Sequence, residues 1–235
     1  MRKPDRPRWT TWDCIKVLVL VLAGSYGVLL LLTPWWEKTA LGQSKGVRFL
    51  LHTIIQAGLI FSGVTYTVRY RYRQDWATLG LHGRNLGRAF SHGTGGGFFL
   101  FLLVLGMGII LEQLLPVEPK PQPFARLVME ARNWQQLIIP FLIGSVIAPF
   151  AEELYFRGFL YPALRVKWGI RWAVFLSALI FGSLHLDPVR LIPLAVGGAG
   201  LAWIYEISGS LVAPIIAHAL WNTIMLVVLY LSTTV

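Results

Sequence analysis

The hydrophobic positions of this chain gather into long runs that are separated by short polar segments. A helix needs about 20 apolar residues to cross a hydrocarbon core of about 30 Å. Seven runs are candidates for such helices: residues 15–33, 47–68, 94–115, 136–156, 172–186, 189–206 and 211–231. The fifth run is short and almost joins the sixth at Asp187-Pro188, so these two alternatively form one broken or re-entrant hairpin. The pattern predicts an all-α, polytopic membrane helix bundle with about seven transmembrane helices, within a range of six to eight.

The composition agrees with a membrane protein. Hydrophobic residues make up 55% of the 235 positions and charged residues 14%, and the mean hydropathy is +0.60. Soluble domains average about 25% charged residues, so this balance argues against soluble, disordered and fibrous classes. Cys14 is the only cysteine, which excludes an intramolecular disulfide framework and a multi-cysteine metal cluster. We expect it to be a buried apolar residue.

The charge distribution predicts the orientation of the chain. Its formal net charge of +10 would suggest a nucleic-acid partner in a soluble protein, but in a membrane protein it is typical of basic cytoplasmic loops. The basic residues occupy the N-terminal segment and alternate loops: Arg2, Lys3, Arg6, Arg8, Arg69, Arg71, Arg73, Arg84, Arg88, Arg165, Lys167 and Arg171. Because short loops rich in Lys and Arg stay in the cytoplasm, we expect a cytoplasmic N-terminus, an external C-terminus and no nucleic-acid partner.

The chain is expected to form one integrated membrane domain, since it shows no internal repeat and no separate soluble domain. Residues 1–133 hold the N-terminal helices and a basic cytoplasmic loop, and residues 134–235 form a second half. The first apolar run is too long for a signal-peptide core and lacks a small-residue cleavage site, which predicts a retained helix. No eukaryotic targeting signal is recognised, so a bacterial plasma membrane is expected. Four glycines, at 93 and 95–97, are expected to mark the beginning of the third helix.

Six polar residues lie in or beside the apolar helices of the second half: Glu152, Glu153, Arg157, His185, His218 and Asn222. An ionisable group inside a bilayer costs several kcal/mol unless it is paired or faces a wet cavity, so it is a functional candidate by default. A lone His such as His52 is more simply a packing residue, and Glu112 and Glu206 lie near helix ends, from which they can reach the interface. The cluster of six exceeds what packing needs.

The spacing of these residues predicts two contacts. Glu153 and Arg157 are four apart, so on a helix they share a face and can form an ion pair. Glu152 is rotated by about 100° and stays available for another role. If the Lys167-Trp168-Gly169 corner turns the chain into a regular antiparallel helical hairpin, reflection about the corner brings Glu152 level with His185. We therefore expect these two side chains to touch.

His218 and Asn222 are also four apart and share one face of the last helix. Treating the last three helices as straight rods does not bring His218 level with His185. Either the helices tilt and break near Pro188, Pro193 or Pro214, or these groups do not form one site.

Hydrolysis of a peptide bond fits this set of residues. It needs a base to activate water, donors to stabilise the tetrahedral oxyanion and a proton for the leaving amine. Glu152 with His185 is a candidate base, and His218 with Asn222 supplies candidate donors. The chain has no Gly-x-Ser-x-Gly elbow, no His-Glu-x-x-His helix and no Walker-type loop. A zinc site formed by Glu152, His185 and His218 stays open, because two His and one carboxylate are a familiar zinc set.

Three motifs of the second half resemble those of one family. Glu152, Glu153 and Arg157 form an EExxxR pattern, Phe181 and His185 an FxxxH pattern, and His218 and Asn222 an HxxxN pattern. Three such motifs in order within apolar helices resemble the CPBP or Abi family, which contains the type II CAAX prenyl endopeptidases. The match covers about the last 100 residues.

The resemblance implies a glutamate-type intramembrane protease without a metal cofactor, with residues 134–235 as its catalytic core. It implies that Glu152 activates water with the help of His185, that His218 and Asn222 hold the oxyanion, and that Glu153 and Arg157 support them. The implied partners are the lipid bilayer and a membrane-associated peptide or protein, whose prenylation stays open. The competing interpretation is a non-enzymatic membrane protein, such as a bacteriocin-immunity, scaffold or transport protein, that keeps the same fold.

Overall fold

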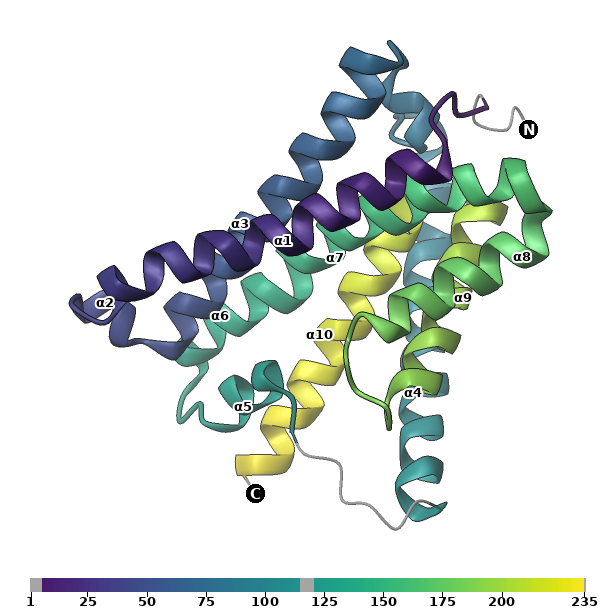
Figure 1. The fold of residues 1–235 in the computed structure, drawn as a ribbon. Helices are drawn as coiled ribbons and strands as arrows, with labels where there is room; N and C mark the ends of the chain where they lie inside the picture. Colours follow the sequence, from purple (N-terminus) through teal and green to yellow (C-terminus); the bar gives the residue numbers. More distant parts are fainter. Residues whose placement is uncertain (1–5, 115–120, 235) are drawn as a thin grey trace.

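The computed structural model describes residues 6–114 and 121–234, and within these residues every regular element is a helix (Figure 1). The long helices are α1 (Thr11–Trp36), α3 (Lys45–Thr65), α4 (Leu86–Leu114), α8 (Tyr161–Ser183), α9 (Leu191–Ser208) and α10 (Val212–Thr234). Short α-helices are α2 (Ala40–Gln43), α5 (Pro123–Met129), α6 (Ile138–Phe141) and α7 (Ala148–Glu153). Three π-helices, η1 (Tyr66–Arg71), η4 (Leu142–Ile147) and η5 (Leu154–Leu160), and two 3₁₀-helices, η2 (Trp76–Leu79) and η3 (Trp134–Leu137), complete the described part.

The predicted polytopic bundle is confirmed. Six helical stretches of the described residues are long and apolar enough to cross a membrane, within the predicted range of six to eight. The fourth stretch, Trp134–Ser183, contains both the fourth and the fifth apolar runs. It reverses direction at Gly169, which has φ 76° and ψ 176° and therefore a backbone conformation that favours glycine. The corner predicted at Lys167-Trp168-Gly169 is thus where the chain turns back (Figure 1).

Three basic segments lie at the same end of the bundle. The N-terminal segment, the connection after η1 and the α8 corner all lie toward this end (Figure 1). The backbone N–H of Arg8 donates to Gln74 Oε1 at 2.7 Å, which ties the first two segments together. Arg2 and Lys3 lie outside the described residues. This arrangement brings the basic loops to one side, as the alternation along the sequence predicts.

The glycines at 93 and 95–97 do not mark a helix start, and that expectation is wrong. Helix α4 begins at Leu86 and continues through all of them. A Cβ on Gly97 would lie 2.6 Å from the Ala217 carbonyl oxygen of α10, and a Cβ on Gly93 would lie 2.8 Å from that of Ala213. Small residues four apart let two membrane helices approach closely, which stabilises their packing. Gly93 and Gly97 are therefore the α4 side of the contact with α10, while a Cβ on Gly96 would lie 2.5 Å from Ile204 of α9.

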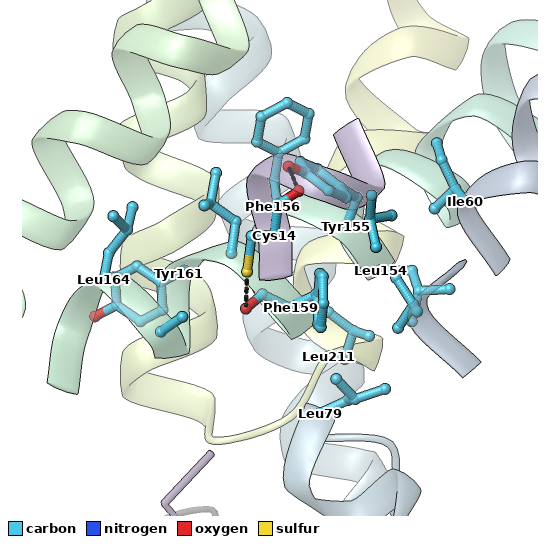
Figure 2. Close-up of a cluster of buried hydrophobic side chains, with 14 of the residues drawn as sticks. Cys14, Ile60, Leu79, Leu154, Tyr155, Phe156, Phe159, Tyr161, Leu164 and Leu211 are labelled. Atoms are coloured by element: carbon cyan, nitrogen blue, oxygen red, sulfur yellow. Dashed lines mark hydrogen bonds between the residues drawn. The ribbon is translucent and has the colours of Figure 1, made fainter. Parts of the chain in front are cut away.

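A buried apolar cluster packs α1 against the segment that follows α7 (Figure 2). Cys14 on α1 is fully buried, together with Leu154, Phe159 and Tyr161 from η5 and the beginning of α8. The prediction that Cys14 is a buried apolar residue is confirmed. This cluster holds the N-terminal helix against the segment that carries the acidic motif.

The two π-helices of the fourth stretch have a cause in the sequence. η4 ends two residues before Pro149, and η5 ends two residues before Pro162. A proline ring inside a helix clashes with the carbonyl four positions earlier and provides no N–H for it. Those carbonyls belong to Ser145 and Gly158, inside the two π-helices, where the wider turn accommodates the ring.

Glycine substitutions in α4 test the contact with α10. We expect Gly97→Ala to lower the midpoint of thermal unfolding in detergent by several degrees, because the added methyl group meets main-chain atoms of Ala217 and overpacking costs about 1 to 3 kcal/mol. Gly95→Ala is the matched control, since nothing lies within 4 Å of a Cβ there. Equal midpoints for the two variants would contradict the proposed packing.

Candidate active site

The candidate residues come from three parts of the bundle that lie far apart in the sequence. Glu152 and Glu153 end α7, and Arg157 lies on η5. His218 and Asn222 lie on α10. His185 follows the end of α8. The helical packing described above brings these parts toward the middle of the bundle.

Glu153 and Arg157 form an ion pair at the centre of this group. Arg157 Nη1 donates to Glu153 Oε1 at 2.7 Å, and both side chains are 0% exposed. Arg157 Nη2 donates to the Gly198 carbonyl of α9 at 2.8 Å. A Cβ on Gly198 would lie 3.0 Å from Phe181 Cδ1 and 3.3 Å from that same nitrogen, so glycine avoids a tight contact where the guanidinium approaches α9. The predicted pair is present, and α9 completes it.

His218 is held by the same carboxylate. Its Nδ1 lies 2.8 Å from Glu153 Oε1, and an ionised carboxylate only accepts, so Nδ1 carries the proton and donates. The other ring nitrogen, Nε2, faces Glu152 Oε2 at 3.9 Å. The Glu152 side chain is 29% exposed, in contrast to its fully buried neighbour. Glu153 thus orients the imidazole, and Glu152 is the accessible carboxylate beside it.

Phe181 connects the two histidines. Its ring centroid lies 4.9 Å from that of His185 and 5.8 Å from that of His218, with edge-on geometry in both contacts. The Arg157 guanidinium also lies over the Phe181 ring, 4.7 Å from its centroid. His185 and His218 therefore both contact one aromatic ring. Both histidines reach one region of the bundle through Phe181, although α9 and α10 run unbroken past Pro193 and Pro214.

Glu152 and His185 are not in direct polar contact. No hydrogen bond or ion pair joins them in the part of the chain that the structure describes. His185 Nδ1 instead lies 2.8 Å from the Phe181 carbonyl oxygen. The reflection assumed two regular helices, but η5 follows Glu152 in one arm, and α8 ends at Ser183, before His185, in the other. The expected contact is therefore not present as a hydrogen bond or ion pair in the described structure.

The loop that carries His185 is fixed from its far side. Asp187 accepts hydrogen bonds from the Arg190 side chain and backbone and from Gln122 Nε2, which precedes α5. Burial disfavours the charged carboxylate, but these hydrogen bonds outweigh it and hold the pKa of Asp187 below its ordinary value. Leu186 has φ 52°, so the chain turns sharply immediately after His185. The loop is anchored as a tight turn between α8 and α9.

Asn222 lies one turn beyond His218 on α10. Its Nδ2 donates to the Gly144 carbonyl of η4 at 2.8 Å. Because an amide nitrogen carries two hydrogens, one remains to donate elsewhere. Ser145, next to Gly144, has a buried hydroxyl oxygen without a hydrogen-bond partner among the described residues. The Gly144 carbonyl of η4 therefore holds Asn222 in place, and the next residue of η4, Ser145, is also polar.

The alternative zinc set is not assembled in this structure. Among the described residues, no three His, Cys, Asp or Glu side chains are grouped closely enough to hold a metal ion. Glu152 Oε2 lies 3.9 Å from His218 Nε2, while His185 contacts the Phe181 ring and its Nδ1 lies 2.8 Å from the Phe181 carbonyl oxygen. The geometry therefore supplies no zinc site from Glu152, His185 and His218.

Sequence reasoning missed the main-chain and aromatic parts of the site. The Gly198 carbonyl accepts from Arg157, and the Gly144 carbonyl accepts from Asn222. No pattern of side chains in the sequence predicts such main-chain acceptors. Trp221 packs on His218 with ring centroids 5.6 Å apart. Phe181 was visible as the first residue of the FxxxH pattern, although its contacts with both histidines were not predictable from the sequence.

An apolar groove of about 290 Å³ lies beside this region. It is lined by residues from η3, α6, η4 and α10: Trp134, Leu137, Ile138, Phe141, Leu142, Leu226 and Val227. Leu226 is one turn from Asn222 on the same helix, and Leu142 precedes Gly144 by two positions. The groove therefore runs along the same two elements that Asn222 joins.

The second half of the chain matches a known family. Residues 134–224 match the family described as type II CAAX prenyl endopeptidase Rce1-like. All six polar residues singled out above lie within this range. The family match and the relatives below confirm the resemblance carried by the three motifs.

Three curated relatives are similar to this chain. The protein named "Putative membrane peptidase YdiL" of Bacillus subtilis (strain 168) is 26% identical over 131 residues, 56% of this chain and 53% of that protein. CAAX prenyl protease 2 of Rattus norvegicus is 27% identical over 129 residues, 52% of this chain and 40% of that protein. CAAX prenyl protease 2 of Homo sapiens is 26% identical over 145 residues, 52% of this chain and 44% of that protein. The chain thus spans about half or less of each relative. No solved structure matches it significantly.

Removal of one partner tests the buried ion pair. We expect Arg157→Met to lower the unfolding midpoint in detergent by about 10 °C or more, because it leaves Glu153 buried without its cation, which costs about 3 to 5 kcal/mol. Arg165→Met is the control, since Arg165 and its partner Glu206 are partly exposed. The double variant Glu153→Gln/Arg157→Met should recover part of the loss. A smaller effect at Arg157 than at Arg165 would contradict this account.

Proposed function

We propose that this chain, which is similar over residues 134–224 to type II CAAX prenyl endopeptidases, is an intramembrane endopeptidase. It hydrolyses a peptide bond in a membrane-associated peptide or protein. The observation that carries the proposal is the pairing of an accessible carboxylate, Glu152, with a histidine that a second, buried carboxylate orients. Such an arrangement provides a base and an adjacent hydrogen-bonding group within an apolar bundle.

Glu152 is the proposed water-activating base. Glu153 already pairs with Arg157 and His218, whereas Glu152 has no cationic side chain within ion-pair distance among the described residues except His218, and only if that ring is protonated. The Glu152 carboxylate takes a proton from water as the water oxygen bonds to the carbonyl carbon. His185, which contacts the same Phe181 ring as His218, is proposed to assist Glu152 through a bridging water. The buried pair thereby leaves Glu152 free for chemistry.

His218 and Asn222 are the proposed oxyanion donors. Because the Nδ1 hydrogen of His218 is already donated to Glu153, His218 takes this role as an imidazolium, which donates from Nε2. Both lie on one face of α10, and Asn222 keeps one amide hydrogen after its bond to Gly144. As the tetrahedral intermediate forms, negative charge develops on the former carbonyl oxygen, and donors held in place beforehand stabilise it. The intermediate then collapses with cleavage of the C–N bond. The proton held by Glu152 passes to the departing nitrogen, and the products are a carboxylate and an amine.

The apolar groove beside Asn222 is the proposed seat of the hydrophobic part of the substrate. It is lined mostly by aliphatic and aromatic side chains and begins one helical turn from Asn222. A lipid-modified or transmembrane peptide could lie in it with its scissile bond toward the polar cluster. We propose a bacterial plasma membrane as the location, with a cytoplasmic N-terminus, because the basic segments gather at one end of the bundle (Figure 1).

Substitution of Glu152 tests the mechanism. The probes are two internally quenched peptides in proteoliposomes, one ending in a farnesylated cysteine followed by three residues and the other with the unmodified cysteine. Loss of a general base costs about 10² to 10⁴ in rate, so we expect Glu152→Gln to lower kcat by at least about 100-fold. Glu112→Gln is the control, because Glu112 is exposed near the end of α4.

Two outcomes would contradict the proposal. Retained cleavage by a folded Glu152→Gln variant would remove Glu152 from the chemistry. The second outcome is that neither probe is cleaved and that cells with and without the protein show the same membrane-protein termini. This outcome would favour a non-enzymatic scaffold, immunity or transport role. Folding is checked for each variant by its elution profile and helical content.

Chelation tests the zinc alternative. We expect cleavage by the wild-type protein to be unchanged after dialysis against a zinc chelator, because the described residues do not group three metal ligands at the site. The measurement is the initial rate before dialysis, after dialysis and after addition of zinc. A loss of rate that zinc restores would favour the set Glu152, His185 and His218 instead.

A further inference from the structure

Helix α1 lies outside the region that matches the family, yet it is bonded directly to the helix that carries Arg157. Trp9 Nε1, just before α1, donates to the Phe159 carbonyl of η5 at 2.8 Å. The Cys14 thiol donates weakly to the same carbonyl at 3.6 Å (Figure 2). In return, Tyr155 of η5 donates from its hydroxyl to the Cys14 carbonyl at 3.0 Å. We call these three hydrogen bonds the α1 latch.

The latch is buried and reinforced by packing. Trp9 is only 3% exposed, and its ring stacks on that of Phe159 with centroids 5.3 Å apart. A buried indole N–H is destabilising unless it finds an acceptor. The Phe159 carbonyl provides that acceptor, so the Trp9 ring is favoured in the orientation that points its N–H toward this carbonyl. The bond therefore constrains where η5 can lie relative to α1.

The beginning of α1 is itself held rigidly. The Thr10 side chain accepts from the Asp13 backbone N–H, and the Asp13 carboxylate accepts from the Thr10 backbone in a capping box. The Asp13 carboxylate also accepts from the Tyr72 hydroxyl at 2.8 Å and forms an ion pair with Arg71 at 3.4 Å. The latch thus connects η5 to a fixed point at the basic end of the bundle.

The latched segment sets the register of the proposed catalytic groups. η5 begins directly after Glu153 and contains Arg157, and all of its residues are buried. A π-helix has a wider turn than an α-helix, so a return to α-helical winding would rotate the side chains that follow relative to those before it. Rotation of Arg157 relative to Glu153 would disturb the carboxylate that orients His218.

From this placement we propose that Trp9 is a positioning residue, which holds η5 in its π-helical register and so keeps Glu153 and His218 aligned. Only the expected effect on catalysis rests on the proposed peptidase function. The physical link between Trp9 and η5 can be measured without any substrate.

The experiment removes the hydrogen-bond donor of Trp9 but keeps an aromatic ring at this position. Trp9→Phe removes the indole N–H but can still stack on Phe159, and Tyr155→Phe removes the return bond to Cys14. Trp12→Phe is the matched control, because Trp12 is 61% exposed on the same helix. Each full-length variant in proteoliposomes is assayed with the two quenched peptides, and hydrogen exchange is followed by mass spectrometry.

We expect Trp9→Phe and Tyr155→Phe to lower kcat about five- to tenfold with KM unchanged, since the substrate-binding surface is not altered. Exchange in residues 154–164 should become several-fold faster, while exchange in Leu191–Ser208 stays as in the wild type. The Trp12→Phe variant should match the wild type in both measurements. General destabilisation would instead speed exchange in both segments and lower the active fraction of each variant.

Three results would overturn the proposal: unchanged exchange in residues 154–164, faster exchange with unchanged kcat, or equal effects of Trp9→Phe and Trp12→Phe. If the wild-type protein cleaves neither peptide, the proposed function fails on its own. Hydrogen exchange then still decides the latch, since local acceleration supports it and its absence overturns it.

Discussion

The buried ion pair between Glu153 and Arg157 is the constraint on which the geometry of the site depends. Two opposite charges are stable inside an apolar bundle only if they are paired and further hydrogen bonds support the pair. Arg157 also donates to the Gly198 carbonyl, and the Glu153 carboxylate also holds His218. The pair therefore ties η5, α9 and α10 together at one point. Glu152, the adjacent residue, is left accessible beside the oriented imidazole.

Much of the fold could be predicted from the apolar runs, because the length of a membrane helix is set by the bilayer. The reversal near Gly169 was also predictable, since basic residues and a glycine interrupt the hydrophobic pattern there. The irregularities inside the helices were not predictable from the sequence. The glycines beginning at Gly93 read as a helix boundary, yet Gly93 and Gly97 admit α10, which a pattern along one segment cannot show. The two π-helices likewise depend on prolines together with packing.

The members of the candidate site could be predicted better than their contacts. Spacing along one helix gave the Glu153–Arg157 pair, because partners four residues apart share a face whatever surrounds them. The expected contact of Glu152 with His185 relied on two regular helices, and η5 and the early end of α8 remove that regularity. The contact of His218 with Glu153 joins α10 to α7, and only tertiary structure reveals it. Main-chain acceptors such as Gly198 have no signature in the sequence.

The most direct measurement of the central claim is an experimental structure of the Glu152→Gln variant with an uncleaved membrane peptide bound. The account predicts that the carbonyl oxygen of the scissile bond accepts from Asn222 and His218. It also predicts that the side chain at position 152 lies one water molecule away from the carbonyl carbon. A peptide bound elsewhere on the bundle, or with its backbone remote from α10, would contradict the assignment of this polar cluster as a hydrolytic site.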